Sequence, residues 1–203
     1  AVAARTGQPA YNPKTHQGFF RYLMVRQSLS TGQLMLCLVT TSGSRAIIDT
    51  LVHQLLAHHP TGIASVYWGI SNKVADVAVP EELTLVHGAA YLDEQLGPFQ
   101  LQLHPLSFLQ PTHRQAERMY EQLCGAIRDP MPNVAWDLYC GVGVIALYLS
   151  RHARTIYGID SEAHHLDLAS RNAARNDVHN VHFHLGRVET LLRDRRFWLQ
   201  EAK

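Results

Sequence analysis

The sequence predicts an α/β protein in which an incomplete, doubly wound parallel sheet follows a small mixed α+β domain. From residue 134 onward, short apolar runs alternate with segments of helical periodicity, the order expected for parallel strands joined by helices. Before residue 111, short alternating runs and turn residues surround a single helical stripe. We therefore expect two domains, at residues 1–104 and 105–203.

The composition is that of an ordinary globular chain, with 203 residues, 46% of them hydrophobic and 17% charged. The net charge is only +1, so a nucleic-acid surface has to be a local patch. Three widely spaced cysteines disfavour a disulfide framework or a metal cluster and fit a reducing, cytoplasmic setting. No apolar run approaches the ~18 residues of a membrane span. The chain opens without Met, and we expect it to be a piece of a longer protein.

The first domain is predicted to begin with a hairpin. Between Gly18 and Thr40, apolar residues alternate on both sides of a Ser-Thr-Gly turn at 30–32. Ser44 is placed to cap a helix with an apolar stripe through Leu55. Further strand-like runs cover residues 63–70, 83–86 and 99–103. We expect an antiparallel sheet with one helix.

The second domain is predicted to open with an amphipathic helix after Pro111. The elements that follow alternate regularly: strand 134–138, helix 144–152, strand 154–159, helix 161–175, strand 181–185 and a helix from about Glu189. A doubly wound sheet usually has about six strands. We therefore expect its second half to lie beyond Lys203.

The segment Trp-Asp-Leu-Tyr-Cys-Gly-Val-Gly-Val-Ile at residues 136–145 is the most informative stretch of the chain. An apolar strand ends there on Asp137 and turns through Gly141 and Gly143 into a helix. Glycine permits a sharp turn and close approach of a ligand, and the helix start directs N–H groups and its positive dipole end at the same place. This arrangement is typical of nucleotide-cofactor sites.

A second carboxylate supports a cofactor site over a ligand-free strand-to-helix connection. Asp160 ends the next strand, 17 residues beyond Gly143, where it can accept ribose hydroxyls. Gly-x-Gly-x-x-Ala at 141–146 also fits a dinucleotide fingerprint, so NAD is an alternative. Asp137 favours S-adenosylmethionine, because a carboxylate attracts its positive amino-acid end and repels a diphosphate. Asn172 and Asn176 give the second helix an ending common in methyltransferases.

Nearly the whole chain resembles the RNA uracil-C5 methyltransferases, which include 23S rRNA and tRNA enzymes. The most specific motifs are Asp-Leu-Tyr-Cys-Gly-Val-Gly at 137–143, Gly-Ile-Asp at 158–160 and Ser-Phe-Leu-Gln-Pro at 107–111. A weaker match is His-Gln-Gly-Phe-Phe-Arg-Tyr-Leu at 16–23. The resemblance implies a class I, Rossmann-like methyltransferase domain, S-adenosyl-L-methionine as cofactor and RNA as partner, with rRNA preferred and tRNA possible.

The resemblance also implies roles for individual residues. Gln110 contacts the cofactor, Tyr139 and the backbone after it line the methionine side, and Asp160 holds the ribose. Arg187 is a further candidate contact, although relatives often carry an acidic or polar residue there, as they do at Val144.

In the family, a cysteine attacks uracil C6, C5 takes the methyl group and a carboxylate assists proton loss. The family's Ser-Cys-Asn-Pro and Asp-Pro-Pro-Arg motifs do not occur in these 203 residues. We therefore expect the nucleophile and base beyond Lys203, and a chain that binds cofactor without turning over. The family's iron–sulfur cysteine cluster and N-terminal RNA-binding barrel are also not found here.

Other readings remain open. Cys140 invites a nucleophilic role, but a packed thiol is the commoner explanation within a cofactor turn. His182 and His184 share one strand face and could chelate a metal, although a solvated face is the simpler interpretation. The alternatives in function are a methyltransferase with another acceptor, a dinucleotide oxidoreductase, and a non-catalytic RNA- or cofactor-binding module.

Overall fold

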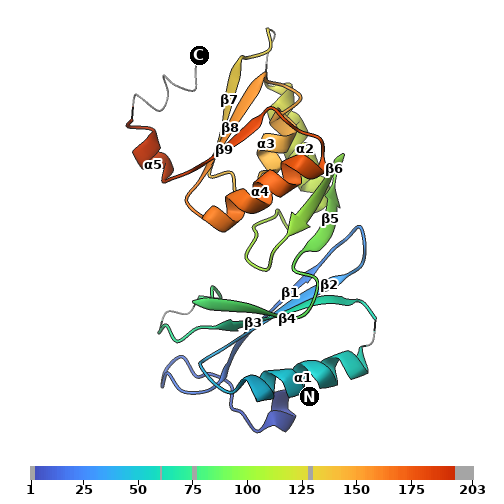
Figure 1. Ribbon diagram of the computed structural model, residues 1–203, viewed down its shortest axis with the longest axis vertical. Helices are drawn as coiled ribbons and strands as arrows, with labels where there is room; N and C mark the ends of the chain where they lie inside the picture. The colour runs from blue at the N-terminus through green and yellow to red at the C-terminus, as the bar shows by residue number, and fades with distance from the viewer. Residues whose placement is uncertain (1–2, 60, 75–76, 128–129, 195–203) are drawn as a thin grey trace. The chain divides into compact units, whose positions relative to one another are not determined.

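The computed structural model describes residues 3–59, 61–74, 77–127 and 130–194. The chain divides into two compact units (Figure 1). One comprises Ala1–Glu94 with His104–Leu106, and the other comprises Gln95–Leu103 with Ser107–Lys203. A domain boundary at residues 104 and 105 stays a prediction. Within the described residues, no helix combines the length and apolar character needed to cross a membrane.

The first unit contains a four-stranded sheet in the order β1-β2-β3-β4. Its elements are η1 (Ala3–Thr6), β1 (Phe20–Gln27), β2 (Leu34–Thr40), α1 (Arg45–His58), β3 (Ile63–Ile70) and β4 (Glu82–Gly88). The predicted hairpin is present as the antiparallel β1–β2 pair, in which Leu23 lies opposite Leu38. The sequence therefore located this hairpin and the helix that follows it.

The expected all-antiparallel sheet is wrong, because β2 and β3 pair in parallel. Helix α1 connects these two strands and returns the chain to the edge from which β2 starts, as a crossover between parallel strands requires. The pairs β1–β2 and β3–β4 are antiparallel, so the sheet is mixed.

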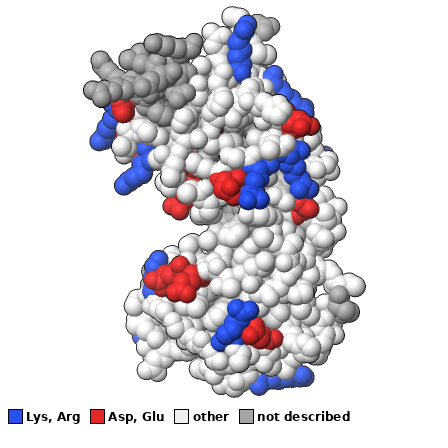
Figure 2. Space-filling view, viewed as in Figure 1, with Lys and Arg blue, Asp and Glu red and all other residues white. Residues whose placement is uncertain are grey.

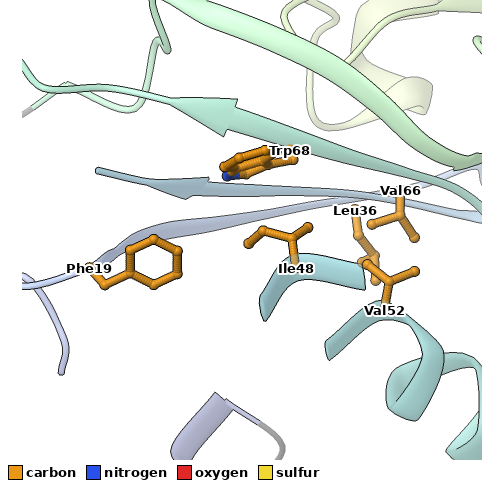
Figure 3. Packing of buried hydrophobic residues seen from close by; sticks show 6 residues of the cluster. All are labelled: Phe19, Leu36, Ile48, Val52, Val66 and Trp68. Carbon is orange, nitrogen blue, oxygen red and sulfur yellow. The ribbon is translucent and has the colours of Figure 1, made fainter. Parts of the chain in front are cut away.

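The core of this unit lies between the sheet and α1 (Figure 3). Ile48 and Val52 are one helical turn apart, so they share the face of α1 that packs against Leu36, Val66 and Trp68 of the strands. The Trp68 Nε1–H donates to Thr40 Oγ1 at 2.8 Å, which satisfies a polar atom inside this apolar cluster. Packing of one apolar helix face thus fixes α1 on the sheet.

Strands β5 (Leu92–Leu96) and β6 (Phe99–Leu103) form a two-stranded sheet. Gly97, at the turn between them, has φ +55°, and its N–H donates to Glu117 Oε1 at 3.0 Å. The sequence missed β5, because Asp93, Glu94 and Gln95 interrupt its apolar pattern.

The second unit contains the predicted parallel sheet, in the order β7-β8-β9. Its further elements are α2 (His113–Gly125), β7 (Val134–Leu138), α3 (Val144–Leu149), β8 (Thr155–Asp160), α4 (Ala163–Arg175), β9 (Val181–Leu185) and α5 (Val188–Leu191). Ala146 and Leu149 of α3 pack with Ile156 of β8 in an apolar cluster, which holds the helix against the sheet. Because all three strands are parallel, their carboxyl ends meet at one edge.

Candidate cofactor site

The connection from β7 to α3, called the glycine turn here (residues 139–143), alternates left-handed residues with ordinary ones. Tyr139, Gly141 and Gly143 have φ of +63°, +53° and +82°. The left-handed region costs glycine little and a bulky side chain of order 1 kcal/mol or more. The two glycines are therefore conformational requirements, and Tyr139 adopts a strained conformation that its surroundings maintain.

The two glycines face different surroundings. A Cβ on Gly141 would meet no atom within 4 Å, so the space beside it is open to a ligand. A Cβ on Gly143 would lie 3.0 Å from the Ala169 Cβ and 3.1 Å from the Phe183 ring. Gly143 is thus needed for the close packing of the turn against α4 and β9, whereas Gly141 leaves room above the turn.

Asp137 lies beneath the glycine turn. Its side chain is buried, and its Oδ2 accepts a hydrogen bond from the N–H of Ala146, the third residue of α3, at 2.9 Å. Burial raises the pKa of Asp137 to about 7; the bond from Ala146 opposes this shift and the negative charge of Asp160 adds to it. A positive group brought close to this carboxyl would favour its ionised form.

Asp160 is held by three donors. Its Oδ2 accepts the Gly141 N–H at 2.9 Å, and its Oδ1 accepts the Glu162 N–H at 3.0 Å and lies 3.2 Å from His165 Nδ1. Burial acts to raise the pKa of Asp160, but these hydrogen bonds outweigh it and keep the pKa below its ordinary value. Asp160 is therefore an anion that ties the glycine turn to the end of β8.

Tyr139 projects from the turn with 63% of its surface exposed. Its hydroxyl donates to Glu189 Oε1 at 2.8 Å, which links the end of β7 to the start of α5. Arg187, the residue before α5, lies with its Nε 3.9 Å from Glu189 Oε2. The structure thus brings Tyr139 and Arg187 together through Glu189, a residue the sequence analysis did not propose for the site.

Gln110 lies apart from these contacts. It lines a surface hollow of about 200 Å³ at the start of α2, together with Pro111, Thr112, Gln115, Ala116 and Met119. Among the described residues, none of its side-chain atoms hydrogen-bonds to the glycine turn. Its predicted contact with the cofactor therefore stays a prediction.

Cys140 has the environment of a packed thiol. It is 8% exposed, and burial raises its pKa, with further increases from the negative charges of Asp137 and Asp160. A thiolate is the reactive form, and these surroundings disfavour it. The geometry supports Cys140 as a structural part of the turn.

The histidines of β9 lie beside an aromatic ring. His182 and His184 have ring centroids 5.6 Å and 5.5 Å from that of Tyr157 on the neighbouring strand. The part of the chain that the structure describes contains no group of three or more His, Cys, Asp or Glu side chains arranged to hold a metal ion.

The structure adds three residues to the site, and the sequence contained only weak signals for them. His165 follows Asp160 by five residues on the first turn of α4, and Glu189 follows Arg187 by two. Asn172 was noticed as part of a typical helix ending, but its Nδ2–H donates to the Val142 carbonyl within the glycine turn at 3.1 Å. Such tertiary contacts depend on how α4 and α5 are placed, which spacing along the chain does not reveal.

Part of the second unit is similar to a known domain family. Residues 134–197 match a family described as "Methyltransferase domain", and this segment contains the glycine turn and Asp160. The α/β, Rossmann-like fold predicted from the sequence is confirmed.

Relatives named as RNA methyltransferases match most of the chain. An uncharacterized RNA methyltransferase of Caldanaerobacter subterraneus is 32% identical over 187 residues, which are 92% of this chain and 42% of that protein. One from Clostridium tetani is 30% identical over 182 residues, 90% of this chain and 39% of that protein. The chain thus spans about two fifths of the length of these relatives.

A solved structure is similar to most of the chain. The tRNA (uracil-54, C5)-methyltransferase of Pyrococcus abyssi, in complex with S-adenosyl-L-homocysteine, superposes with a TM-score of 0.67 and is 25% identical. The match covers 85% of this chain and 40% of that enzyme. Together with the domain match, it bears out S-adenosyl-L-methionine as the predicted cofactor.

Proposed function

We propose that this chain is the cofactor-binding part of an S-adenosyl-L-methionine-dependent methyltransferase that methylates C5 of a uridine in RNA. The observation that carries the proposal is the glycine turn held between two carboxylates, Asp137 below it and Asp160 beside it. The motifs at 107–111 and 137–143 support the uracil-C5 chemistry, as does the similarity to a tRNA uracil-C5 enzyme. We propose 23S rRNA as the preferred substrate, tRNA as the alternative and the cytoplasm as the location.

The residues of the turn fit the two charged or polar ends of this cofactor. Gly141 leaves open space in which a ligand can approach the backbone. Asp137 supplies negative charge for the positive amino-acid end, and the exposed ring of Tyr139 lines the same side. Asp160 accepts from the ribose. We assign Gln110 and Arg187 as further cofactor contacts, on the family resemblance.

The two carboxylates also argue against a dinucleotide. A diphosphate placed over the glycine turn would bring its negative charge toward Asp137 and the ionised Asp160, and neither acid has Lys or Arg among its hydrogen-bond or ion-pair partners in the described part of the chain. A methyl donor with a positive sulfur and a positive amino group would instead be attracted by the two carboxylates. The electrostatics of the site thus favour S-adenosylmethionine over NAD.

Ribose binding requires an adjustment at Asp160. A carboxylate has about four acceptor positions, and Gly141, Glu162 and His165 already use three. Accepting two ribose hydroxyls therefore displaces one donor. His165 makes the longest of the three contacts, at 3.2 Å, and its side chain can rotate, so we assign the displacement to His165.

S-Adenosylmethionine supplies an electrophilic methyl group when bound. The residues of this chain bind and orient it: the turn fixes the backbone that approaches it, and Asp137 and Asp160 hold its two ends. We propose that the nucleophile for uracil C6 and the acceptor for the C5 proton belong to a part of the full-length protein outside these 203 residues. The chain alone then binds cofactor and RNA without completing methyl transfer.

RNA contact has to be local, because the charge of the protein is nearly balanced. Figure 2 shows small groups of Lys or Arg and of Asp or Glu scattered over a mostly uncharged face. The net charge of +1 agrees with this distribution. Recognition of a folded RNA therefore relies on specific contacts more than on a long-range positive field.

Methyl transfer tests the proposal directly. The full-length protein and the 203-residue chain are incubated with S-adenosylmethionine and either rRNA or tRNA, and modified nucleosides are identified by mass spectrometry. We expect 5-methyluridine with the full-length protein only. A different methylated nucleoside would favour a methyltransferase with another acceptor, and RNA binding without any methylation would favour a non-catalytic module. Turnover by the 203-residue chain would contradict the proposed location of the nucleophile.

A further inference from the structure

Two asparagines four residues apart, Asn172 of α4 and Asn176 directly after its last residue, bind the backbone of β6. Asn172 Oδ1 accepts the Gln102 N–H at 2.7 Å, and Asn176 Oδ1 accepts the Gln100 N–H at 2.9 Å. Asn176 Nδ2–H donates to the Gln100 carbonyl at 2.7 Å, and Asn172 Nδ2–H lies 3.4 Å from the Gln102 carbonyl. Each side-chain amide thus pairs with the N–H and the carbonyl of one β6 residue, as the backbone of a neighbouring strand would.

Only Asn172 also reaches the glycine turn. Its Nδ2–H donates to the Val142 carbonyl at 3.1 Å, between Gly141 and Gly143. The same peptide is held at its other end, because the Gly143 N–H donates to the Cys140 carbonyl at 2.9 Å. The plane of the peptide between Val142 and Gly143 is therefore fixed on both sides.

The packing around Asn172 reinforces this contact. Asn172 is fully buried, and Ala169, three residues earlier on the same face of α4, lies against Gly143. A buried amide that loses a partner is left with a polar group that water cannot reach, so burial favours the state in which Asn172 makes its hydrogen bonds to β6 and to Val142 together. Helix α4 thus presents Ala169 and Asn172 to the turn as one rigid surface.

We propose that Asn172 is a positioning residue for cofactor binding: by holding the Val142 carbonyl, it fixes the orientation of the glycine turn on which the cofactor lies. This inference rests on the proposed function. Asn176 holds β6 in the same way, but within the described residues it makes no hydrogen bond to the turn, so it has no such role. The two asparagines therefore form a matched pair at the C-terminal end of α4.

The variants Asn172→Asp and Asn176→Asp test the proposal. Each keeps an acceptor for the β6 N–H and loses the Nδ2 donor, but only Asn172→Asp removes the donor to Val142. We expect Asn172→Asp to weaken S-adenosyl-L-homocysteine binding about tenfold and Asn176→Asp less than about twofold. Affinities are measured by calorimetry below the unfolding transition of both variants, with urea midpoints recorded in parallel. Equal losses in the two variants would overturn the positioning role.

A measurement on the unaltered chain decides the matter if Asn172→Asp does not fold. Amide hydrogen exchange by NMR is compared with and without S-adenosyl-L-homocysteine. We expect the ligand to slow exchange of the Gln102 N–H, bound by Asn172, at least about threefold more than that of the Gln100 N–H, bound by Asn176. Equal slowing would contradict the inference. If the unaltered chain binds no S-adenosyl-L-homocysteine, that result contradicts the proposed function itself, and not only the positioning role of Asn172.

Discussion

Asp137, the last residue but one of β7, and Asp160, the last residue of β8, lie on neighbouring parallel strands with little exposed surface, yet their pKa values move in opposite directions. Asp137 is 4% exposed and its pKa rises to about 7, whereas Asp160 is 8% exposed and its pKa falls below the ordinary value. Two differences explain this: Asp137 lies deeper in the protein and accepts one N–H, whereas Asp160 lies nearer the surface and accepts two N–H groups and a contact from His165. The depth of burial and the hydrogen bonds accepted together decide the charge of each carboxyl.

The two acids therefore depend on pH in opposite ways. The folded state holds the proton of Asp137 more tightly than the unfolded state, so its contribution to stability is complete below the ordinary pKa of 3.8 and is lost as pH rises to about 7. Asp160 contributes above its ordinary pKa of 3.8, and that contribution is lost as pH falls through its lowered folded value. At neutral pH, Asp160 is a fixed anion and Asp137 is poised to ionise when a positive ligand arrives.

Replacing Asp160 is expected to have the largest effect. Asp160→Ala leaves three donors without their acceptor and removes the proposed ribose contact, so we expect S-adenosyl-L-homocysteine affinity to fall at least about 100-fold. Each hydrogen bond to a charged group contributes about 1.5–3 kcal/mol, so the free energy of unfolding should fall by at least about 2 kcal/mol. Calorimetry and urea denaturation measure the two effects. Unchanged affinity would retire the ribose assignment.

Replacing Asp137 separates charge from hydrogen bonding. Asp137→Asn keeps an acceptor for the Ala146 N–H but has no carboxyl group to titrate. In the unaltered protein, ionisation of Asp137 should lower the free energy of unfolding between about pH 4 and 7, by up to about 1.4 kcal/mol per pH unit. We expect this decrease to be absent in the variant. Affinity for S-adenosyl-L-homocysteine at pH 7 should fall about tenfold, since the negative charge facing the amino group is gone. Urea midpoints measured across this pH range test the first result. An identical pH slope in both proteins would show that Asp137 titrates normally.

His165 is expected to oppose ligand binding slightly. If the ribose displaces His165 from Asp160, then His165→Ala should raise S-adenosyl-L-homocysteine affinity by about two- to threefold at pH 7. His164→Ala is the control, because His164 is the neighbouring histidine on α4 and its Nδ1 lies 3.9 Å from Glu162 Oε2. A clear loss of affinity on removing His165 would instead mean that it holds Asp160 in the binding geometry.

Tyr139 gives the smallest expected effect. Tyr139→Phe keeps the ring that lines the methionine side and removes only the exposed bond to Glu189. We expect affinity to change less than about twofold, since solvent-exposed polar contacts contribute little. Glu189→Gln should behave in the same way. A tenfold loss in either variant would show that the link between β7 and α5 closes over the ligand.

Most of the fold could be predicted because the sequence contains clear local patterns of apolar residues and turn residues. The strand at 63–70 and the glycine turn were located from apolar runs bounded by turn residues, and their bounds agree with β3 and the β7–α3 connection. The direction of β3 was not available from such patterns, since pairing depends on where α1 packs. Strand β5 was missed because its polar residues hide the alternation.

For the candidate site, the sequence predicted the backbone turn well and the contacts between side chains less well. Gly141, Gly143 and Asp160 follow from the geometry of a strand-to-helix turn, and the structure brings them together. Asp137 is also at the turn, but no sequence pattern indicated that its side chain is buried or that its pKa is raised. His165 and Asn172 meet the site only through the placement of α4, which depends on packing between segments far apart along the chain.

Calorimetric titration of the 203-residue chain at pH 7 tests the central claim, that the turn between Asp137 and Asp160 binds S-adenosylmethionine. S-Adenosyl-L-homocysteine is titrated in two buffers of different ionisation enthalpy, and NAD is titrated in parallel. We predict binding of S-adenosyl-L-homocysteine with release of part of a proton, as its amino group drives ionisation of Asp137, and no binding of NAD. Binding of NAD alone would contradict the account, as would S-adenosyl-L-homocysteine binding with uptake of a proton.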